Sequence, residues 1–349
     1  MRLLLGTTFL NCLTGSELLF HDLAVGLRGR GHEVTGWVKE LNRDAPLPRL
    51  LHARGIPVSA ELPDEGQIDA VIFQLKETFP IWRERFLDVP RFAICHGPKL
   101  PAEIAPPDLP NTTHLALTRE GLAYLRRHGY SDAVYIGYGV DLRRFAPPAE
   151  LPDRPRRAVV HSKYCDGDVV SQACERLGIE VSELGVQSWR PGPSVDHYSD
   201  IVEVRTDGTV IDHDPHTTAW HVEDILAPAD IVFAMGRSAV EALAMGKACF
   251  AYGYGPVGDG MVTADRLDAF AKVNFSGRAW GRTFDINAIV EELRLYSVSQ
   301  GRRNRRYAVR HYDLVAFLDR VDEQLRDCRP LWRRRLASRL QRPQARARS

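Results

Sequence analysis

The sequence has no long apolar run, and its cysteines form no recurring pattern. No stretch of about 18 uninterrupted apolar residues occurs in the 349-residue chain, which excludes a transmembrane helix. The six cysteines are scattered without a C-x-x-C pair, so we expect reduced thiols and no disulfides, as in a cytoplasmic protein. The start of the chain lacks the small-x-small cleavage site of a signal peptide and is better explained as a first strand.

A large net charge is also missing, since 46 basic residues face 45 acidic ones. The marked imbalance is local: residues 329–349 hold eight arginines and no acid, which leaves 38 basic against 45 acidic residues elsewhere. A general nucleic-acid-binding surface is therefore not expected. This basic tail also contains Leu331, Trp332, Leu336 and Leu340, a composition that fits either weak contact with the inner face of a membrane or a solvated tail.

What the chain does have is the composition of a globular protein, with 44% hydrophobic and 26% charged residues. Its length suggests two domains. A chain of this size buries roughly 75% of its unfolded surface on folding, so its core needs no disulfide or metal.

Short apolar runs alternate with amphipathic stretches, the pattern of a parallel sheet covered by helices. We expect strands at residues 2–5, 32–38, 70–74, 91–95, 114–118, 134–137, 158–162, 229–235 and 248–252. A first helix is predicted from Ser16 to Gly31. The sequence thus predicts an α/β fold with two similar halves.

Proline and charge concentrate at residues 139–157, which places a domain boundary near residue 150. We expect a first domain over 1–150 and a second over 151–304. Helical spacing of apolar residues predicts one long helix over 305–325, within a segment 305–328 that packs against the first domain. Residues 201–213 are predicted to form a hairpin in an insertion at 196–221.

The motif MGRSAVEALAMG, residues 235–246, follows an apolar strand and predicts an anion site. Ser238 is expected to cap a helix that runs to Met245, and the free N–H groups of its first turn favour a phosphate. Glu241 lies one turn further, where its carboxylate can accept hydrogen bonds from ribose hydroxyls. The alternative is that Glu241 merely complements the helix dipole.

Several motifs resemble glycosyltransferase family 4 (glycosyl transferases group 1). ADIVFAMGRSAVEALAM, residues 229–245, is similar to the family's donor-site segment. Residues 14–37 resemble its first glycine-rich loop and helix, and IGYGVDLRRFAPP, residues 136–148, resembles its interdomain linker. NFSGR, residues 274–278, and GDGMVT, residues 258–263, resemble a bacterial subgroup of such enzymes.

The resemblance implies a GT-B fold, with two doubly wound Rossmann-like domains and the nucleotide-sugar donor held mainly by the second. The implied activity is transfer of a hexosyl or related group from a nucleotide-diphosphate sugar, such as a UDP-sugar, to an acceptor hydroxyl. The acceptor would be a glycan, a lipid-linked molecule or another alcohol in bacterial glycan biosynthesis. Neither a metal nor another cofactor is implied, and the expected location is the cytoplasm or the inner face of the membrane.

The resemblance also suggests site residues. Glu241 matches the glutamate that binds ribose. The other expected donor-binding residues are Gly15, Lys163, Arg237, Ser238 and Ala239. For Lys163 a solvated loop lysine is an equal alternative, and for Gly15 a plain strand-to-helix turn is the alternative.

Catalytic residues are expected in the first domain. His96 matches a histidine that faces the donor sugar, where a neutral imidazole can both donate and accept hydrogen bonds to the sugar or the leaving group. From the residues alone, a capped loop histidine is the alternative. For an inverting reaction, His96 and Glu17 are the candidate general bases. The family's paired glutamate, eight residues before Glu241, is absent, because Phe233 stands at that position.

Other functions remain open on the sequence alone. The absent glutamate favours a non-catalytic protein that binds a nucleotide sugar or glycan. Residues 253–258, GYGPVG, match the G-x-G-x-x-G fingerprint of a dehydrogenase, although no helix is expected directly after them. DHDPHTTAWH, residues 212–221, contains metal-ligand residue types, but without a metal-site spacing we expect a polar loop.

Overall fold

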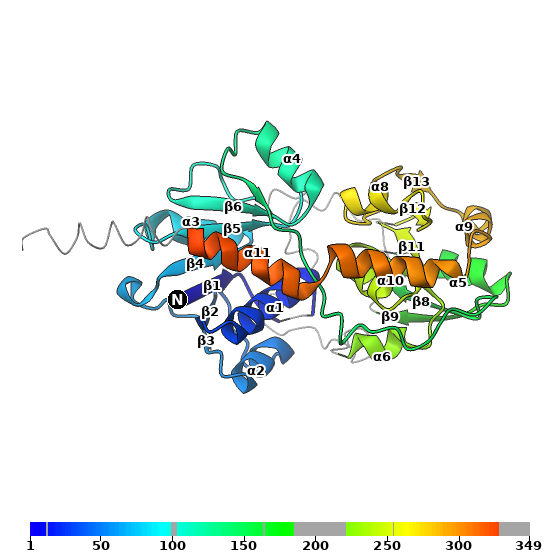
Figure 1. Cartoon of the computed structure of the whole chain (residues 1–349), viewed down its shortest axis with the longest axis horizontal. Helices are drawn as coiled ribbons and strands as arrows, with labels where there is room; N and C mark the ends of the chain where they lie inside the picture. The colour runs from blue at the N-terminus through cyan, green and yellow to red at the C-terminus, as the bar shows by residue number, and fades with distance from the viewer. Residues whose placement is uncertain (12, 99–102, 163–164, 185–220, 254, 328–349) are drawn as a thin grey trace, which may run out of the picture.

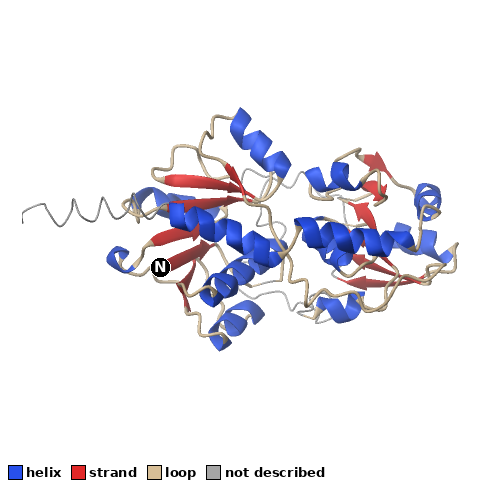
Figure 2. Ribbon diagram, in the orientation of Figure 1, coloured by secondary structure: helices blue, strands red, loops and turns tan. Residues whose placement is uncertain are grey.

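The computed structural model describes residues 1–11, 13–98, 103–162, 165–184, 221–253 and 255–327. These residues form two α/β domains, each built around its own sheet (Figures 1 and 2). The predicted hairpin at 201–213, the basic tail at 329–349 and Lys163 lie outside the described residues. The structure therefore bears on the two domains and on their junction.

The first domain has a seven-stranded sheet in the order β3-β2-β1-β4-β5-β6-β7, with every neighbouring pair parallel. Its strands are β1 (Arg2–Thr7), β2 (Glu33–Val38), β3 (Val58–Ser59), β4 (Ala70–Phe73), β5 (Arg91–Cys95), β6 (Thr112–Ala116) and β7 (Val134–Tyr135). The strands β1, β4 and β5 in the middle of the sheet are almost entirely buried, as expected for a sheet covered on both faces.

Within the described residues, the α-helices between these strands are α1 (Gly15–Gly29), α2 (Pro46–Ala53), α3 (Phe79–Glu84) and α4 (Arg119–Arg127), with short 3-10 turns η1 (Glu65–Gln67) and η2 (Lys76–Thr78). Helix α1 begins where Thr14 and Glu17 form a capping box. It ends before Gly31, whose φ of +85° suits a residue without a side chain. The predicted first helix is thus confirmed to within two residues at each end.

The second domain has a six-stranded sheet in the order β13-β12-β11-β10-β8-β9. Its strands are β8 (Arg157–His161), β9 (Glu180–Leu184), β10 (Ile231–Ala234), β11 (Ala248–Tyr252), β12 (Val257–Met261) and β13 (Arg282–Thr283). Its helices are α5 (Gly167–Glu175), α6 (Val222–Leu226), α7 (Gly236–Ala244), α8 (Leu267–Lys272) and α9 (Ile286–Leu293). The boundary predicted near residue 150 falls between the two sheets.

The G-x-G-x-x-G match at residues 253–258 is not a dinucleotide fingerprint, in keeping with the expectation that no helix follows it directly. Strand β11 turns directly into β12, which pairs with it antiparallel, and the N–H of Gly253 donates to the Val257 carbonyl at 2.8 Å. The next helix, α8, begins only at Leu267. A phosphate-binding fingerprint needs a helix N-terminus directly after the loop, so these glycines serve a tight turn between strands.

The single long helix predicted over 305–325 is also wrong. The segment forms two helices, α10 (Ser299–His311) and α11 (Leu314–Asp327), separated at Tyr312 and Asp313. At this break the interdomain linker pairs with the chain: the Val140 N–H donates to the Tyr312 carbonyl at 2.9 Å, and the Leu314 N–H donates to the Val140 carbonyl at 3.2 Å. Helix α10 packs on α7 and α11 packs on α1, so the break allows one helix to close each domain (Figure 1).

The contact of the linker with the backbone between α10 and α11 leaves no room for a side chain at Gly139. A Cβ there would lie 2.5 Å from the Leu314 Cα and 2.7 Å from its nitrogen, both backbone atoms. We expect Gly139→Ala to reduce the free energy of unfolding by about 1–3 kcal/mol through this overpacking. Gly29→Ala is the control, because a Cβ at Gly29 meets nothing within 4 Å. Denaturant unfolding measures the free energy of unfolding of the two variants. Equal values would contradict the close contact between Gly139 and Leu314.

Two further sequence expectations concern membranes and thiols. Among the described residues, no helix is long and apolar enough to cross a membrane. The four described cysteines, Cys95, Cys165, Cys174 and Cys249, are buried free thiols. Burial raises the pKa of the Cys95 thiol to about 12, which keeps it protonated and unreactive at neutral pH.

Candidate functional site

The candidate site lies where the strand ends of the two domains meet. His96 directly follows β5, and Arg237 follows β10 after two residues. Carboxyl ends of parallel strands share one edge of a sheet, where such folds bind ligands. The two edges face each other, because a Cβ on Gly15 would lie 4.0 Å from the Cβ of Arg237.

Helix α7 starts earlier than the sequence predicted. Its N-cap is Met235 rather than Ser238, which is the third residue of the helix, so the predicted cap is wrong. The reason is Gly236, whose φ of +57° turns the chain directly out of β10 and whose N–H donates to the Asn274 carbonyl at 3.0 Å. The first-turn N–H groups of Arg237 and Ser238 still point out of the helix start, where the dipole favours an anion.

Arg237 and Glu241 form the charged centre of the site. The Nε of Arg237 donates to Oε1 of Glu241 at 2.7 Å, and its Nη2 lies 2.8 Å from Oδ2 of Asp22 on α1. The Nε2 of His161, the last residue of β8, lies 3.5 Å from Oε2 of Glu241. The Glu241 side chain is only 4% exposed, so one arginine and two carboxylates meet almost out of water.

Both carboxylates of this cluster are held in the charged form. Burial alone would raise the pKa of Glu241, but its contact with His161 and the charge of Arg237 bring it below its ordinary value. Burial likewise opposes ionisation of Asp22, and the charge of Arg237 together with a hydrogen bond from His21 lowers the pKa of Asp22 overall. The sequence suggested Arg237 and Glu241, whereas it singled out neither Asp22 nor His161.

The NFSGR segment holds the start of α7 against the first domain. Asn274 and Phe275 both have left-handed backbones, with φ of +60° and +51°. This conformation directs the Asn274 carbonyl to Gly236, while its Oδ1 accepts from the Tyr138 hydroxyl at 2.6 Å. Arg278, four residues on, pairs with Glu120 of α4 through two bonds of 2.8 Å. The segment therefore links the two domains beside the candidate site.

His96 is oriented by Gln74, the residue after β4. The Nε2 of Gln74 donates to the Thr7 hydroxyl at 3.1 Å and to the Ser16 carbonyl at 3.0 Å, which turns its Oε1 toward His96. That oxygen lies 2.9 Å from the His96 Nε2, which must therefore carry the proton. Burial lowers the pKa of His96 to about 4, so the ring is neutral and its Nδ1 is an acceptor.

Glu17 belongs to the capping box at the start of α1. Its side chain is fully buried, and its Oε2 accepts hydrogen bonds from the Thr14 hydroxyl at 2.6 Å and the Thr14 N–H at 3.3 Å. An acceptor hydroxyl cannot approach a carboxylate enclosed in this way. The geometry therefore does not support the general-base prediction for Glu17, and it explains the residue as part of the α1 start.

Glu103 is a titratable residue that the sequence analysis missed. A Cβ on Gly97, the residue after His96, would lie 3.4 Å from Oε2 of Glu103. Burial raises the pKa of Glu103 to about 7, against an opposing effect of the Arg278 charge. A partly exposed carboxyl with this pKa can take up a proton near neutral pH. No spacing motif surrounds it, so only the fold brings it beside His96.

Two further sequence predictions lie in the second domain. Ala239 is fully buried in the first turns of α7 and can take part only through its backbone. Phe233, eight residues before Glu241, where the resemblance to family 4 implies a glutamate, lies within β10 and stacks on Phe250 with ring centroids 4.8 Å apart. Only Met235 separates β10 from α7, so no loop remains that could carry that glutamate.

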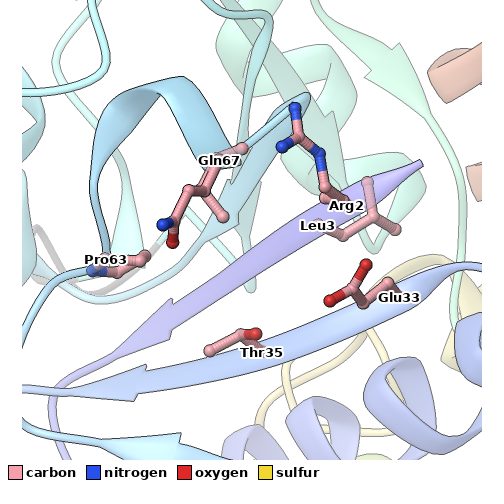
Figure 3. Close-up of a pocket in the computed structure, with 7 residues that line it drawn as sticks. Arg2, Leu3, Glu33, Thr35, Pro63 and Gln67 are labelled. Atoms are coloured by element: carbon pink, nitrogen blue, oxygen red, sulfur yellow. The ribbon is translucent and has the colours of Figure 1, made fainter.

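A separate cavity of about 250 Å³ lies on the first sheet, opposite the candidate site, at the amino ends of its strands. Arg2 and Glu33, the first residues of β1 and β2, are paired in register beside it (Figure 3). The Arg2 guanidinium is already bonded to Asp69 at 2.9 Å. This cavity is at the amino ends of the strands and is therefore distinct from the domain junction.

Within the described ranges, no group of three or more His, Cys, Asp or Glu residues could hold a metal ion.

Comparison with known proteins agrees with this architecture. No protein-family model and no curated protein sequence matches the chain. HepE from Anabaena, solved in complex with UDP and glucose, is 12% identical, with 94% of this chain and 100% of that chain covered and a TM-score of 0.61. UDP-GlcNAc 2-epimerase from Neisseria meningitidis, bound to UDP-GlcNAc, is 11% identical, with 94% and 100% covered and a TM-score of 0.57.

A third similar structure is AviGT4, a glycosyltransferase involved in avilamycin A biosynthesis. It is 16% identical, with 93% of this chain and 97% of that chain covered and a TM-score of 0.53. At such identities the likeness establishes the fold and no more. The chain has the GT-B fold, with two doubly wound domains, and this fold is shared by glycosyltransferases and by an epimerase of UDP-sugars.

Proposed function

We propose that the protein is a glycosyltransferase similar to family 4, which transfers a sugar from a nucleotide-diphosphate sugar to an acceptor hydroxyl. The observation that carries the proposal is the start of α7, where Arg237 and the buried Glu241 face α1 of the first domain. HepE and the Neisseria epimerase, which have the same fold, were solved with UDP and UDP-GlcNAc. This supports a UDP-sugar as the donor.

The reaction breaks the bond between the anomeric carbon and the diphosphate, so the departing phosphate must be stabilised. In this proposal Arg237 and the N–H groups of Arg237 and Ser238 stabilise that charge, without a metal. Glu241 binds the ribose, and Lys163 is a second phosphate ligand. Gly15, which has no side chain, lets the start of α1 approach the diphosphate from the other domain.

The first domain supplies the groups for the sugar and the acceptor. His96 is neutral and offers Nδ1, so it accepts a hydrogen bond from a sugar hydroxyl rather than donating one to the leaving group. In an inverting transfer the acceptor hydroxyl loses its proton to a base on the opposite side from the diphosphate. Glu103, with a pKa of about 7, suits this role better than the enclosed Glu17.

The pH profile of turnover tests the role of Glu103. A base must be deprotonated, so we expect kcat to fall as pH is lowered through about 7, the pKa of Glu103. Glu103→Gln should be slow and should lack this acidic limb. Glu17→Gln is the control, because glutamine also completes a capping box, and its profile should keep the limb. An unchanged limb in Glu103→Gln would assign the proton to another group.

A second candidate function is a protein that binds a nucleotide sugar without transferring it. Phe233 and the missing loop favour it, because the carboxylate that the family places near the donor sugar is not there. Incubation with a panel of UDP-sugars and hexose acceptors, followed by NMR of the products, separates the two. Acceptor-dependent release of UDP and a new glycosidic signal support transfer. Binding without release supports the second candidate, and a change in the sugar's own signals shows epimerisation.

A further inference from the structure

Asp22 makes the first domain's direct contact with the charged centre of the site. Its Oδ2 lies 2.8 Å from the Nη2 of Arg237, and the two side chains are 14% and 13% exposed. Gly15 lies seven residues earlier, two helical turns, and therefore on the same side of α1. The side-chain stem of Arg237 passes Gly15, with the Cβ position 4.0 Å away, and its guanidinium reaches Asp22.

Among the described residues, Arg237 is the one arginine in contact with both carboxylates of the site, which His21 and His161 also contact, at 3.2 Å and 3.5 Å. Its single guanidinium serves two carboxylates, Asp22 at 2.8 Å and Glu241 at 2.7 Å, and both have lowered pKa values. Like charges a few ångströms apart repel strongly where water is excluded. A diphosphate at the start of α7 would add negative charge beside Asp22 and would need the same guanidinium. Glu241 lies on the helix of Arg237, whereas Asp22 lies on the other domain.

We propose that Asp22 is a positioning residue that acts through Arg237, and that its carboxylate and the donor's diphosphate compete for this one guanidinium across the domain junction. This inference rests on the proposed function. When the diphosphate takes Arg237, the ion pair between α1 and α7 is lost. Donor binding is thereby coupled to the contact between the domains, and the competition lowers the affinity of the site for a nucleoside diphosphate.

The chain offers a matched control for this contact. Glu120 on α4 pairs with Arg278 of the second domain through two bonds of 2.8 Å, with side chains 26% and 20% exposed. This pair also joins the two domains through a carboxylate and a guanidinium. It does not contact Arg237 or Glu241, so its loss should weaken the contact between the domains without freeing the phosphate ligand.

Calorimetric titration of UDP at low ionic strength tests the competition in the wild type, Asp22→Asn and Glu120→Gln. We expect Asp22→Asn to bind UDP about tenfold more tightly and to have a lower KM for the donor, because the competing charge is gone. Glu120→Gln should bind UDP as the wild type does.

The result that overturns the proposal is unchanged or weaker UDP binding by Asp22→Asn, since a purely structural residue would give no gain. If Asp22→Asn does not fold, Asp22→Ser is titrated in its place against the same expectation. A gain of equal size in Glu120→Gln would also overturn it, because the effect would then belong to loosened domains. The wild-type titration separately tests the proposed function, which fails if neither UDP nor another nucleoside diphosphate binds.

Discussion

Glu241→Ala is expected to weaken the binding of a nucleoside diphosphate by roughly tenfold to a few hundredfold. The reason is the loss of charge-assisted hydrogen bonds to the ribose, each worth about 1.5–3 kcal/mol. Glu241→Gln keeps one acceptor oxygen and should lose less affinity. The fold should survive both changes, because Arg237 keeps its ion pair with Asp22 when the Glu241 carboxylate is removed.

The alternative role for Glu241, interaction with the helix dipole, predicts a different result. Glu241 is the sixth residue of α7, beyond the first turn in which the dipole effect is concentrated. If the dipole were its role, Glu241→Ala would cost only about 0.3–1 kcal/mol of stability and leave nucleotide affinity intact. Titration calorimetry together with melting temperatures separates the two roles. Unchanged affinity in a less stable Glu241→Ala protein would contradict the donor-site assignment.

His96→Ala is expected to reduce turnover by about a hundredfold while changing nucleotide affinity little, because its proposed contact is to the sugar. Two further variants test which ring nitrogen of His96 contacts the sugar, Nδ1 or Nε2. Asparagine places an amide oxygen close to the position of Nδ1, and glutamine reaches the position of Nε2, which bonds to Gln74. His96→Asn should therefore keep more turnover than His96→Gln, and His96→Gln should resemble His96→Ala.

Steady-state kinetics with the donor varied measures this order of variants. A reversed order, with His96→Gln the more active, would mean that the Gln74 contact matters and that Nδ1 does not bind the sugar. Turnover equal to wild type in His96→Ala would return His96 to a structural role. Both outcomes leave the assignment of Glu241 untouched, because the two residues belong to different domains.

Much of the fold was predictable because it depends on local patterns. The apolar runs at 2–5, 70–74, 91–95 and 248–252 are short and continuous, as buried parallel strands require, and all four form strands. The proline-rich stretch near residue 150 separates the two sheets for an equally local reason. Helix α7 was predicted from its motif, although its first residue was misplaced.

Contacts between distant segments could not be predicted in this way. The start of α7 depends on Asn274, some forty residues further along the chain, and the break between α10 and α11 depends on Val140 in the linker. Both are tertiary effects that override local propensity. A continuous helical spacing over 305–325 gave no sign of the break.

Sequence patterns pointed to residues in both halves of the candidate site, Arg237 and Glu241 in the second domain and Gly15 and His96 in the first. Arg237 and Glu241 lie in one motif, four residues apart, and the structure joins them directly. Asp22, Gln74 and Glu103 reach the junction from three separate loops and helices of the first domain. Asp22 lies within the segment 14–37 that resembles the family's first loop and helix, but that resemblance does not single it out, and Gln74 and Glu103 lie in no motif. Polar residues of these types are common on protein surfaces, so only their placement by the fold distinguishes them.

A crystal structure of the protein with UDP tests the central claim most directly. The account predicts the diphosphate at the start of α7, within hydrogen-bond distance of the N–H groups of Arg237 and Ser238, and the ribose hydroxyls on the carboxylate of Glu241. UDP bound elsewhere, for example beside Gly253 and Gly255 between β11 and β12, with Glu241 still paired only to Arg237 and His161, would contradict it.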